Sequence, residues 1–173
     1  MTPGSDRLQT ERLVLHRPAP GDLDDLARLR LNPAAMATVG GGRSVEDSKA
    51  YLDTMMSHWG THGFGWWIAR ETSGTMVGYA GLRHFECEGR AEIELGYALA
   101  PEYWGRGLGT ELALACIADG RGRMPCVSVV AITLPTNRAS QRVMEKAGLR
   151  YERDIVHAGQ PHVLYRVTFT PKA

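Results

Sequence analysis

Hydrophobic positions in the first third of the chain change their spacing from one short block to the next. Residues 8–17 place Leu13 and Leu15 on one side of an extended segment and Val14 on the other, which predicts a first strand. Residues 44–59 have a capping-box-like start and predict a helix that ends at about Trp59. Between these two blocks a shorter helix is expected, with positions at helical spacing: Leu23, Leu26, Leu29 and Arg30.

The remaining two thirds of the chain indicate strands interrupted by two helices. Residues 66–70 and 76–80 flank a Thr-Ser-Gly turn and predict a hairpin. Further strands are expected at 91–99, 127–132, 149–156 and 163–169, and helices at 107–121 and 137–147. This order of elements indicates one α/β domain over residues 1–173, an α+β arrangement with a central twisted, mixed sheet of about seven strands and about four helices.

The composition indicates a globular protein and excludes several other classes. Hydrophobic residues make up 43% of the 173 positions and charged residues 23%, which argues against wholesale disorder. The net charge is only +1, without the basic excess of a dedicated nucleic-acid binder or a polybasic membrane anchor. No apolar run reaches the ~20 residues of a membrane span, and the first residues lack an apolar signal segment. We therefore expect a cytoplasmic protein without a nucleic-acid or membrane partner.

The three cysteines, Cys87, Cys116 and Cys126, are odd in number and unrelated in spacing. A disulfide framework would leave one of them unpaired, and no Cys-x-x-Cys pair indicates a structural zinc site. His84 and Cys87 are close enough in sequence to suggest metal ligands, but no companion pair accompanies them. We expect buried free thiols in a reducing compartment and no bound metal.

One segment has the features of a phosphate site: residues 99–110, with the sequence LAPEYWGRGLGT. A strand is expected to end there, a glycine-rich loop follows and a helix begins, so several backbone N–H groups converge at a helix N-terminus. Arg106 would add a cation beside them. No Lys follows the glycines, which excludes a P-loop, and the G-x-G-x-G spacing does not fit a dinucleotide fingerprint. The alternative is a turn that only tightens a strand–helix connection.

A second segment, residues 137–149 with the sequence NRASQRVMEKAGL, strengthens the first interpretation. Together the two segments resemble the GNAT superfamily of acyl-CoA-dependent N-acetyltransferases, in the branch typified by ribosomal-protein N-terminal acetyltransferases. Residues 104–109 are similar to its pyrophosphate motif, with Trp104 where this branch often has an aromatic residue. The Asn-x-x-Ser…Glu-Lys-x-Gly pattern is similar to its second coenzyme A motif. Residues 10–13 (TERL) and 94–97 (ELGY) resemble strands of the branch, so the resemblance covers nearly the whole chain.

The resemblance implies acetyl-CoA as cosubstrate and a set of residues that hold it. Amides of residues 106–110 would bind the pyrophosphate, and backbone groups of residues 97–99 would pair with the pantetheine arm like an added strand. Asn137 would bond the pantetheine or the phosphates. Arg138 and Arg142 would either bind the nucleotide's remaining phosphate or lie on a solvated helix face, and both interpretations stay open. The full set of expected coenzyme A contacts is Tyr97, Leu99, Trp104, Gly105, Arg106, Gly107, Leu108, Gly109, Thr110, Asn137, Ser140 and Arg142.

The implied reaction needs an oxyanion donor and a group that handles the proton of the amine. We expect the oxyanion donor among backbone N–H groups near Leu99, splayed out of the sheet by an irregularity at Gly96. Glu92 and Glu94 face the same side of their strand, and Glu94 is the candidate for binding or deprotonating the amine. An α-amine is roughly a tenth to a sixth neutral at pH 7, whereas a lysine amine is neutral only about once in 2500 and needs a true base. Exposed strand carboxylates without a catalytic task are the alternative.

The chain departs from the superfamily at the usual general acid. Many members carry a tyrosine seven residues after the asparagine, and this chain has Met144 there, which cannot donate a proton. We therefore expect Ser140 to lie near the thioester sulfur and to hydrogen-bond it, with a helix-surface hydroxyl as the alternative. The catalytic candidates are thus Glu94 and Ser140.

Aromatic and imidazole side chains form a further group of candidates for the acceptor side, although residues of these types are more often part of a core or a rim. They are His58, Trp59, His62, Trp66, Trp67, His162 and Tyr165.

One function and two alternatives follow. We expect transfer of an acetyl group from acetyl-CoA to a primary amine, either a peptide or protein N-terminus or a small amine, by direct attack on the thioester. A larger acyl donor such as succinyl-CoA is an alternative that an arginine in the acyl pocket would favour. A non-catalytic acyl-CoA-binding sensor is the other, and the presence of Glu92, Glu94 and Ser140 argues against it. A homodimer is compatible with the branch.

Overall fold

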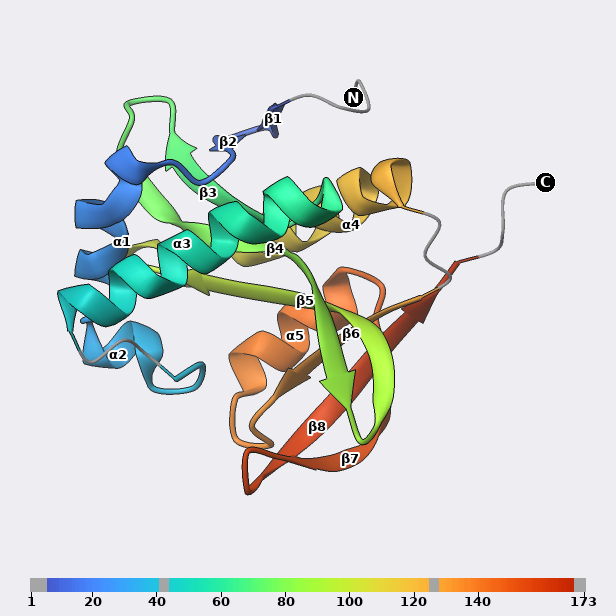
Figure 1. The fold of residues 1–173 in the computed structure, drawn as a ribbon. Coiled ribbons are helices and arrows are strands. Elements are labelled where there is room, and N and C mark those ends of the chain that lie inside the picture. The colour runs from blue at the N-terminus through green and yellow to red at the C-terminus, as the bar shows by residue number, and fades with distance from the viewer. Residues whose placement is uncertain (1–5, 41–43, 125–127, 170–173) are drawn as a thin grey trace.

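The computed structural model describes residues 6–40, 44–124 and 128–169 (Figure 1). Its strands are β1 (Arg7–Gln9), β2 (Leu13–His16), β3 (Trp66–Glu71), β4 (Met76–Cys87), β5 (Arg90–Leu99), β6 (Ser128–Thr133), β7 (Arg150–His157) and β8 (Gln160–Thr168). Its helices are α1 (Leu23–Arg30), α2 (Pro33–Met36), α3 (Val45–His62), α4 (Leu108–Arg123) and α5 (Arg138–Lys146). The predicted mixed α/β sheet is confirmed, and these residues form eight strands and five helices.

The strands form one sheet in the order β1-β2-β3-β4-β5-β6-β8-β7. Neighbouring strands are antiparallel except β5 and β6, which are parallel. A parallel pair needs a crossover connection, and α4 supplies it. In Figure 1 helices α1 and α3 lie across the front of the sheet, and α4 lies behind it.

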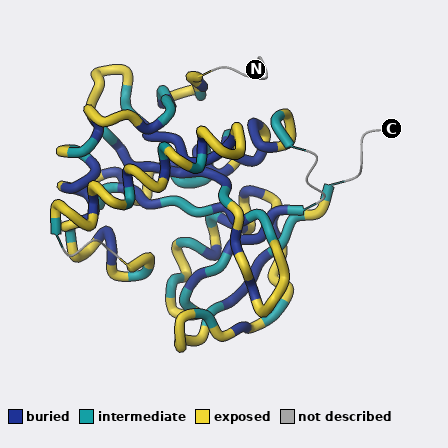
Figure 2. Tube along the Cα trace, viewed as in Figure 1, coloured by how far each residue is buried: buried dark blue, intermediate teal, exposed yellow. Residues whose placement is uncertain are grey.

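Each face of the sheet carries its own apolar cluster, because successive residues of a strand point to opposite faces. Leu112 of α4 packs with Leu95 of β5 in the larger cluster. Met55 of α3 packs with Ile68 and Tyr79 in a second cluster, on the face that α1 and α3 cover. Figure 2 shows the result: the middle of the sheet is buried, and the outer sides of the helices are exposed. The central strands are therefore held from both sides.

The parallel pair β5–β6 is open over most of its length. The two strands are paired at Glu94↔Val130 alone. On its other edge β5 stays in register with β4 from Gly78↔Leu99 to Cys87↔Arg90, without a shift. The expected irregularity at Gly96 is therefore wrong, since the opening arises where β6 diverges from β5. Gly96 is needed for a different reason, because a Cβ there would lie 2.5 Å from the ring of Trp66.

The other differences from the predicted elements are local. Residues 8–17 form two short strands, because the Thr10 N–H donates to the Leu13 carbonyl and closes a turn between them. Helix α2 was not predicted. The Asn32 side chain caps it by accepting hydrogen bonds from the N–H groups of Ala34 and Ala35, and a proline occupies its first turn. Helix α3 starts after Ser44 as predicted and continues to His62.

Two of the cysteines are buried free thiols, which confirms that prediction for Cys87 and Cys116. Burial raises the pKa of the Cys116 thiol, so this side chain stays protonated and acts as a small apolar core residue. Cys126 lies outside the described residues. No helix within the described ranges is both long and apolar enough to cross a membrane.

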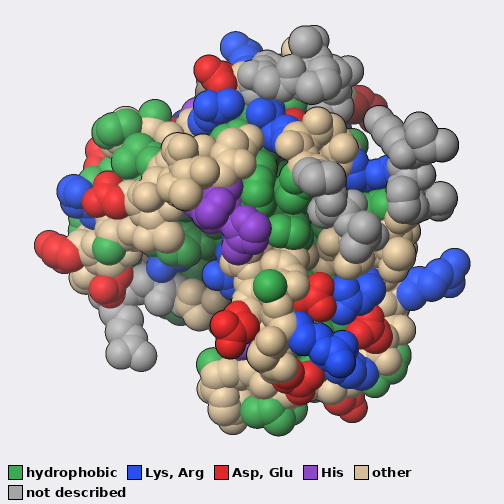
Figure 3. Space-filling model, turned by 45° about the vertical axis from the view of Figure 1, so that its right-hand side comes forward, with side chains coloured by type: hydrophobic (Ala, Val, Ile, Leu, Met, Phe, Trp, Pro, Cys, Tyr) green, Lys and Arg blue, Asp and Glu red, His purple; other side chains and the backbone are tan. Residues whose placement is uncertain are grey.

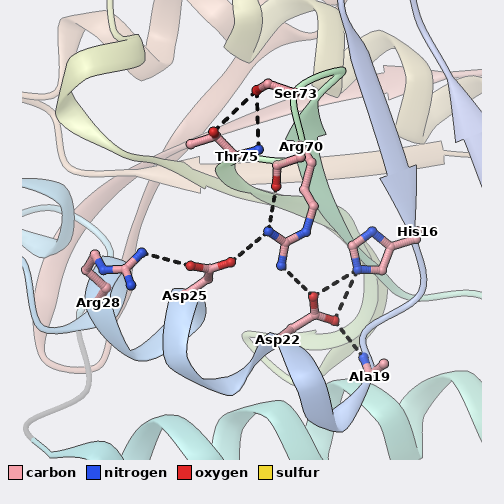
Figure 4. A network of polar contacts seen from close by, with 9 residues as sticks. His16, Ala19, Asp22, Asp25, Arg28, Arg70, Ser73 and Thr75 are labelled. Carbon is pink, nitrogen blue, oxygen red and sulfur yellow. Dashed lines mark hydrogen bonds and ion pairs between the residues drawn. The ribbon is translucent and has the colours of Figure 1, made fainter.

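A network of carboxylates and an arginine fixes the start of α1 against β3 (Figure 4). Arg70 Nη2 donates to Asp22 Oδ1 at 2.9 Å, and its Nη1 donates to Asp25 Oδ2 at 2.7 Å. Asp22 also accepts the Ala19 N–H at 2.8 Å, and His16 Nε2 lies 2.9 Å from Asp22 Oδ1. Burial alone would raise the pKa of Asp22, but the hydrogen bonds from His16, Arg70 and Ala19 outweigh burial and hold that pKa below its ordinary value.

We predict that Asp22→Asn destabilises the protein by about 2 kcal/mol at pH 7, because it leaves Arg70 without its buried partner. A carboxyl whose pKa is lowered by folding stabilises fully above its unfolded pKa of ~3.9 and loses that contribution as the pH falls through the folded value. The variant should therefore lose less stability than the parent on acidification. Urea unfolding between pH 3 and pH 8 measures both effects.

The matched control is Asp53→Asn, because Asp53 pairs with Lys49 on the exposed side of α3. Such a pair contributes about 0.5 kcal/mol or less. Equal losses in the two variants, or equal acid sensitivity of Asp22→Asn and the parent, would contradict the role given to Asp22.

Candidate functional site

The glycine-rich loop leads into a helix whose first turn is uncapped. Gly105 and Gly107 have φ values of +72° and +80°, a conformation that residues with a side chain disfavour. Gly107 is the N-cap of α4, and no side chain accepts a hydrogen bond at this cap. The free N–H groups and the positive end of the helix dipole therefore favour an anion at this point.

A cavity of about 670 Å³, which we call the loop cavity, opens beside this turn. Its walls are the carboxyl end of β5, the start of α4 and one side of α5. Gly109 allows α4 and α5 to approach, since a Cβ there would lie 3.3 Å from Val143 Cγ2. An uncapped helix at one end and an open strand edge along one wall fit a pyrophosphate joined to an extended arm.

The edge of β5 in this wall presents backbone groups of alternate residues. The Ala100 N–H donates to Val77 on β4, so in this antiparallel pair the N–H and C=O groups of Tyr97 and Leu99 point to the opposite edge. Trp104 Nε1 donates to the Leu99 carbonyl at 2.9 Å. The backbone N–H and C=O of Tyr97 and the N–H of Leu99 remain available to pair with an added extended chain.

Most of the expected coenzyme A contacts line the loop cavity, but of the three arginines considered for the phosphates only Arg142 does so. Lys146, to which the sequence analysis gave no role, lines it as well. Arg106 does not line it, because its Nη2 lies 3.8 Å from Glu71 Oε1. Arg138 donates to Gln141 instead. The expected contacts that line the cavity are Tyr97, Leu99, Trp104, Gly105, Gly107, Leu108, Gly109, Thr110, Asn137, Ser140 and Arg142.

Asn137 lines the loop cavity, but its amide is used within the protein. Its Oδ1 accepts the Ser140 N–H at 3.1 Å and caps α5. Its Nδ2 donates to Thr133 at the end of β6 and to Thr38 after α2, at 3.0 and 2.9 Å. Both N–H donors are thus engaged, so the residue joins three segments around the cavity, and only the carbonyl oxygen has capacity left for a ligand.

A second cavity of about 500 Å³, which we call the sheet cavity, lies where β5 and β6 diverge. Glu94 and Trp66 are among its wall residues. The two cavities adjoin, because five residues line both: Ala37, Thr38, Val39, Tyr97 and Ser140.

The contact between Tyr97 and Ser140 marks the junction of the two cavities. The Tyr97 hydroxyl lies 2.8 Å from Ser140 Oγ and 3.1 Å from the Ser140 carbonyl oxygen. Burial raises the pKa of Tyr97 to about 12, and the hydrogen bond with Ser140 only partly offsets this. The phenol is therefore protonated at neutral pH, and either hydroxyl of the pair can be the donor. Sequence reasoning missed this role, because it placed only the backbone of Tyr97 at the site.

Glu94 is a buried carboxyl in the wall of the sheet cavity, with 6% of its surface exposed. Arg83, directly opposite on β4, donates from Nε to Glu94 Oε2 at 2.5 Å. Burial raises the pKa of Glu94, and the Arg83 guanidinium opposes this without cancelling it. A carboxylate with a raised pKa is a better base than an exposed one.

Glu92, two residues away, belongs to a separate ion-pair network. Arg166 Nη2 and Nη1 donate to its two carboxylate oxygens at 2.8 and 2.9 Å. The hydrogen bonds from Arg166 lower the pKa of Glu92, which burial alone would raise. Glu152 and Arg153 extend the network along β7. In Figure 3 acidic and basic side chains lie side by side over the lower part of the molecule. Glu92 therefore belongs to this network, whereas Glu94 lines the sheet cavity.

The aromatic and imidazole candidates divide into different groups. Trp66 and His162 line the sheet cavity, whereas Trp59 and Trp67 belong to the buried core. Tyr165 is buried, and its hydroxyl donates to Glu145 rather than reaching either cavity.

His58, His62 and His84 gather outside the two cavities, with adjacent ring centroids 4.6 and 4.5 Å apart. Histidine side chains are seen together near the middle of the face in Figure 3. Within the described part of the chain no group of three or more His, Cys, Asp or Glu side chains is arranged to hold a metal ion.

Several residues of the sheet cavity have no signal in the sequence. Arg30, Tyr51, Tyr79 and His157 line it from α1, α3, β4 and β7, so they are distant along the chain. Arg83 is a further such residue, because it lies opposite Glu94 in the β4–β5 pair, beyond the predicted hairpin of residues 66–70 and 76–80.

Comparison with known proteins gives one family. The sequence model of the acetyltransferase (GNAT) domain matches residues 12–150. The uncharacterized protein YkkB of Bacillus subtilis is 28% identical over 161 residues, covering 92% of this chain and 94% of that protein. The uncharacterized N-acetyltransferase YoaA of the same species is 24% identical over 148 residues, covering 84% of this chain and 83% of that protein.

Solved structures share the fold. An acetyltransferase from Agrobacterium tumefaciens has a TM-score of 0.82 at 24% identity over 94% of each chain. The ribosomal-protein-S5-alanine acetyltransferase from Vibrio fischeri has a TM-score of 0.77 at 17% identity, covering 95% of this chain and 97% of that one. RimL, a ribosomal L7/L12 alpha-N-protein acetyltransferase in complex with coenzyme A, has a TM-score of 0.77 at 16% identity, covering 94% of this chain and 97% of that one.

The matched range contains the uncapped helix, the open edge of β5, Glu94 and Ser140. The geometry and the match therefore agree with the resemblance drawn from the two sequence segments. The chain belongs to the acetyltransferase (GNAT) family and is an acyl-CoA-dependent N-acetyltransferase.

Proposed function

We propose that this enzyme transfers an acetyl group from acetyl-CoA to the primary amine of a small molecule or of a peptide or protein N-terminus. The observation that carries the proposal is the junction of the loop cavity with the sheet cavity at Tyr97 and Ser140. One cavity has the donors for a pyrophosphate and an extended arm, and the other has a buried carboxylate for an amine. Fold neighbours named for ribosomal-protein N-termini support an α-amine as acceptor.

Glu94 has the chemistry to take the proton of the amine. Among the described residues Arg83 is its hydrogen-bond partner, through Oε2, so Oε1 is available to an incoming ammonium group. Its raised pKa makes proton transfer from the amine less unfavourable than for an exposed glutamate. An α-amine with a pKa of ~7.7–8.0 needs only modest help of this kind.

Ser140 and Tyr97 have the chemistry to protonate the leaving group. A thioester carbonyl is attacked by the neutral amine, the C–S bond breaks, and the thiolate needs a proton. Ser140 Oγ can donate to the sulfur while it accepts from the Tyr97 hydroxyl. This pair would take the role of the tyrosine that many members of the superfamily carry at the position of Met144. The Leu99 N–H, on the open edge of β5, is placed to donate to the oxyanion.

A reducing, cytoplasmic location accords with the buried free thiols and is part of the proposal. The homodimer stays a prediction.

The test of function is a thiol-release assay with acetyl-CoA against peptides, polyamines and aminoglycoside antibiotics, beside calorimetric binding of coenzyme A. Acetylation of at least one amine class supports the proposal. Coenzyme binding without transfer to any amine would overturn it.

We predict that Gly105→Ala weakens coenzyme A binding about tenfold, whereas Gly74→Ala leaves it unchanged. Both glycines have positive φ, +72° and +94°, and both have open space where a Cβ would project. Alanine therefore costs about 1 kcal/mol of folding stability at either position. Only Gly105 adjoins the donors of α4, so calorimetric titration separates the local effect from the shared strain. Equal affinities of the two variants would argue against a phosphate site at the loop.

We predict that Glu94→Gln lowers kcat/KM for the amine about 100-fold, because the base is lost. In the parent, activity should fall as the pH drops through the raised pKa of Glu94, since the protonated carboxyl cannot accept a proton. The corresponding acid limb should disappear in the variant. Glu92→Gln is the control: it should lower the Tm but keep the activity per folded molecule. Loss of activity in both variants alike would exclude Glu94 as the base.

We predict that Ser140→Ala and Tyr97→Phe each lower kcat about tenfold without a large change in coenzyme A affinity. Because both hydroxyls belong to one hydrogen-bond chain, the double variant should be little slower than either single one. Thr54→Ala, which removes an exposed helix hydroxyl, is the control. Single-turnover kinetics measure the step directly. Unchanged turnover in Ser140→Ala would refute its role.

A further inference from the structure

Arg30, the last residue of α1, has an unusual position for an arginine. It is only 8% exposed, and it lines the sheet cavity. Its guanidinium carbon lies 3.9 Å from the centroid of the Tyr51 ring, so the planar group is stacked on an aromatic face. An arginine is seldom buried to this extent unless it is paired.

No carboxylate compensates this charge. Among the described residues none forms an ion pair with Arg30, and its Nε is a buried donor without a hydrogen-bond partner. Two other arginines of the same region are paired, Arg70 with Asp22 and Asp25, and Arg83 with Glu94. Burying a cation is costly unless an anion or hydrogen bonds compensate it, and stacking on a ring recovers only part of that cost.

The surroundings of Arg30 are polar but uncharged. Burial raises the pKa values of Tyr51 and Tyr79 above their ordinary range, so both phenols stay neutral. Tyr79 is a hydrogen-bond partner of both Tyr51 and Arg30. Glu94, the carboxylate of the sheet cavity, is bonded to Arg83. The wall of the sheet cavity therefore has two arginines and one carboxylate, an excess of one positive charge before its histidines are counted.

We propose that Arg30 anchors a subsite for a carboxylate that the substrate brings into the sheet cavity. This inference rests on the proposed function and narrows it to a substrate class, substrates that carry a carboxylate beside the reacting amine or on the acyl group. A guanidinium offers a planar fork of donors that matches a carboxylate, and a desolvated pair of this kind is strong. A cavity of about 500 Å³ has the size of a small-molecule site.

The carboxylate has two chemical sources, the acceptor amine or a charged acyl group such as succinyl. Both would enter the same cavity, so the assay has two arms. One arm uses acetyl-CoA with matched amino acids and carboxamides, such as β-alanine and β-alaninamide. The other arm uses succinyl-CoA and acetyl-CoA with the uncharged carboxamide as acceptor. Rates are compared per fraction of neutral amine, so that differences in amine pKa do not enter.

For the parent enzyme we expect kcat/KM to favour the carboxylate about tenfold or more in one arm, the range for a charge-assisted hydrogen bond. Arg30→Gln should abolish the preference through KM, and Arg30→Lys should retain part of it. Arg17→Gln is the matched control, because Arg17 also stacks on a ring, 4.4 Å from Trp59, and also has a buried Nε without a partner. Arg17 lies outside both cavities, so the preference should survive.

A binding measurement keeps the test independent of turnover and of whether Arg30→Gln folds. Calorimetric titration of the parent with β-alanine and with β-alaninamide, in the presence of coenzyme A, should show tighter binding of the carboxylate. Succinyl-CoA should bind more tightly than acetyl-CoA if the acyl group is the source. Equal binding and equal kinetics in every pair, or the same loss in Arg17→Gln as in Arg30→Gln, would overturn the inference. Acetylation of amines without any preference would overturn the inference and leave the proposed function intact. Carboxylate binding without acyl transfer would support the inference and overturn the proposed function.

Discussion

The divergence of β6 from β5 is the constraint on which the rest of the site depends. The two strands are joined at Glu94↔Val130 alone, and beyond that pair the edge of β5 is open. The opening exposes backbone groups of Tyr97 and Leu99, and the two cavities adjoin there, since Tyr97 lines both. If the parallel pair continued, those backbone groups would be used in the sheet and the two cavities would be separate.

Charged groups fall into two classes that differ in what compensates them. Asp22 accepts hydrogen bonds from Arg70, His16 and Ala19. Glu92 accepts two from Arg166. The pKa values of both carboxyls are lowered, as expected of groups that stabilise the fold. Glu94 and Arg30 lie in the wall of the sheet cavity; Arg83 offsets the burial of Glu94 only in part, and no described residue forms an ion pair with Arg30. Such groups cost folding free energy, and their retention in a cavity is typical of residues that meet a ligand.

The two motifs of the sequence have different physical roles. The loop at Gly105 and Gly107 leads into a helix that no side chain caps, which is the basis for proposing it as the ligand site. Asn137, by contrast, uses its amide to tie α5 to β6 and to the segment after α2. Its capping bond fixes the first turn of α5, and with it Ser140 beneath the Tyr97 hydroxyl. The hydroxyl pair at the junction therefore depends on a residue that itself donates nothing to the substrate.

The sequence by itself determined the element order, the mixed sheet, the glycine loop and the candidates Glu94 and Ser140, because periodicity, capping and short motifs are local. Only the tertiary structure decided that β6 diverges, that Arg106 faces Glu71, and that Glu92 is paired with Arg166 while Glu94 is buried. It also decided that Arg30 lines the sheet cavity and that the Tyr97 hydroxyl contacts Ser140. These facts depend on contacts between segments that are distant along the chain, such as Glu92 and Arg166, which are 74 residues apart. Burial and charge pairing are set by such contacts, and no local pattern of residues encodes them.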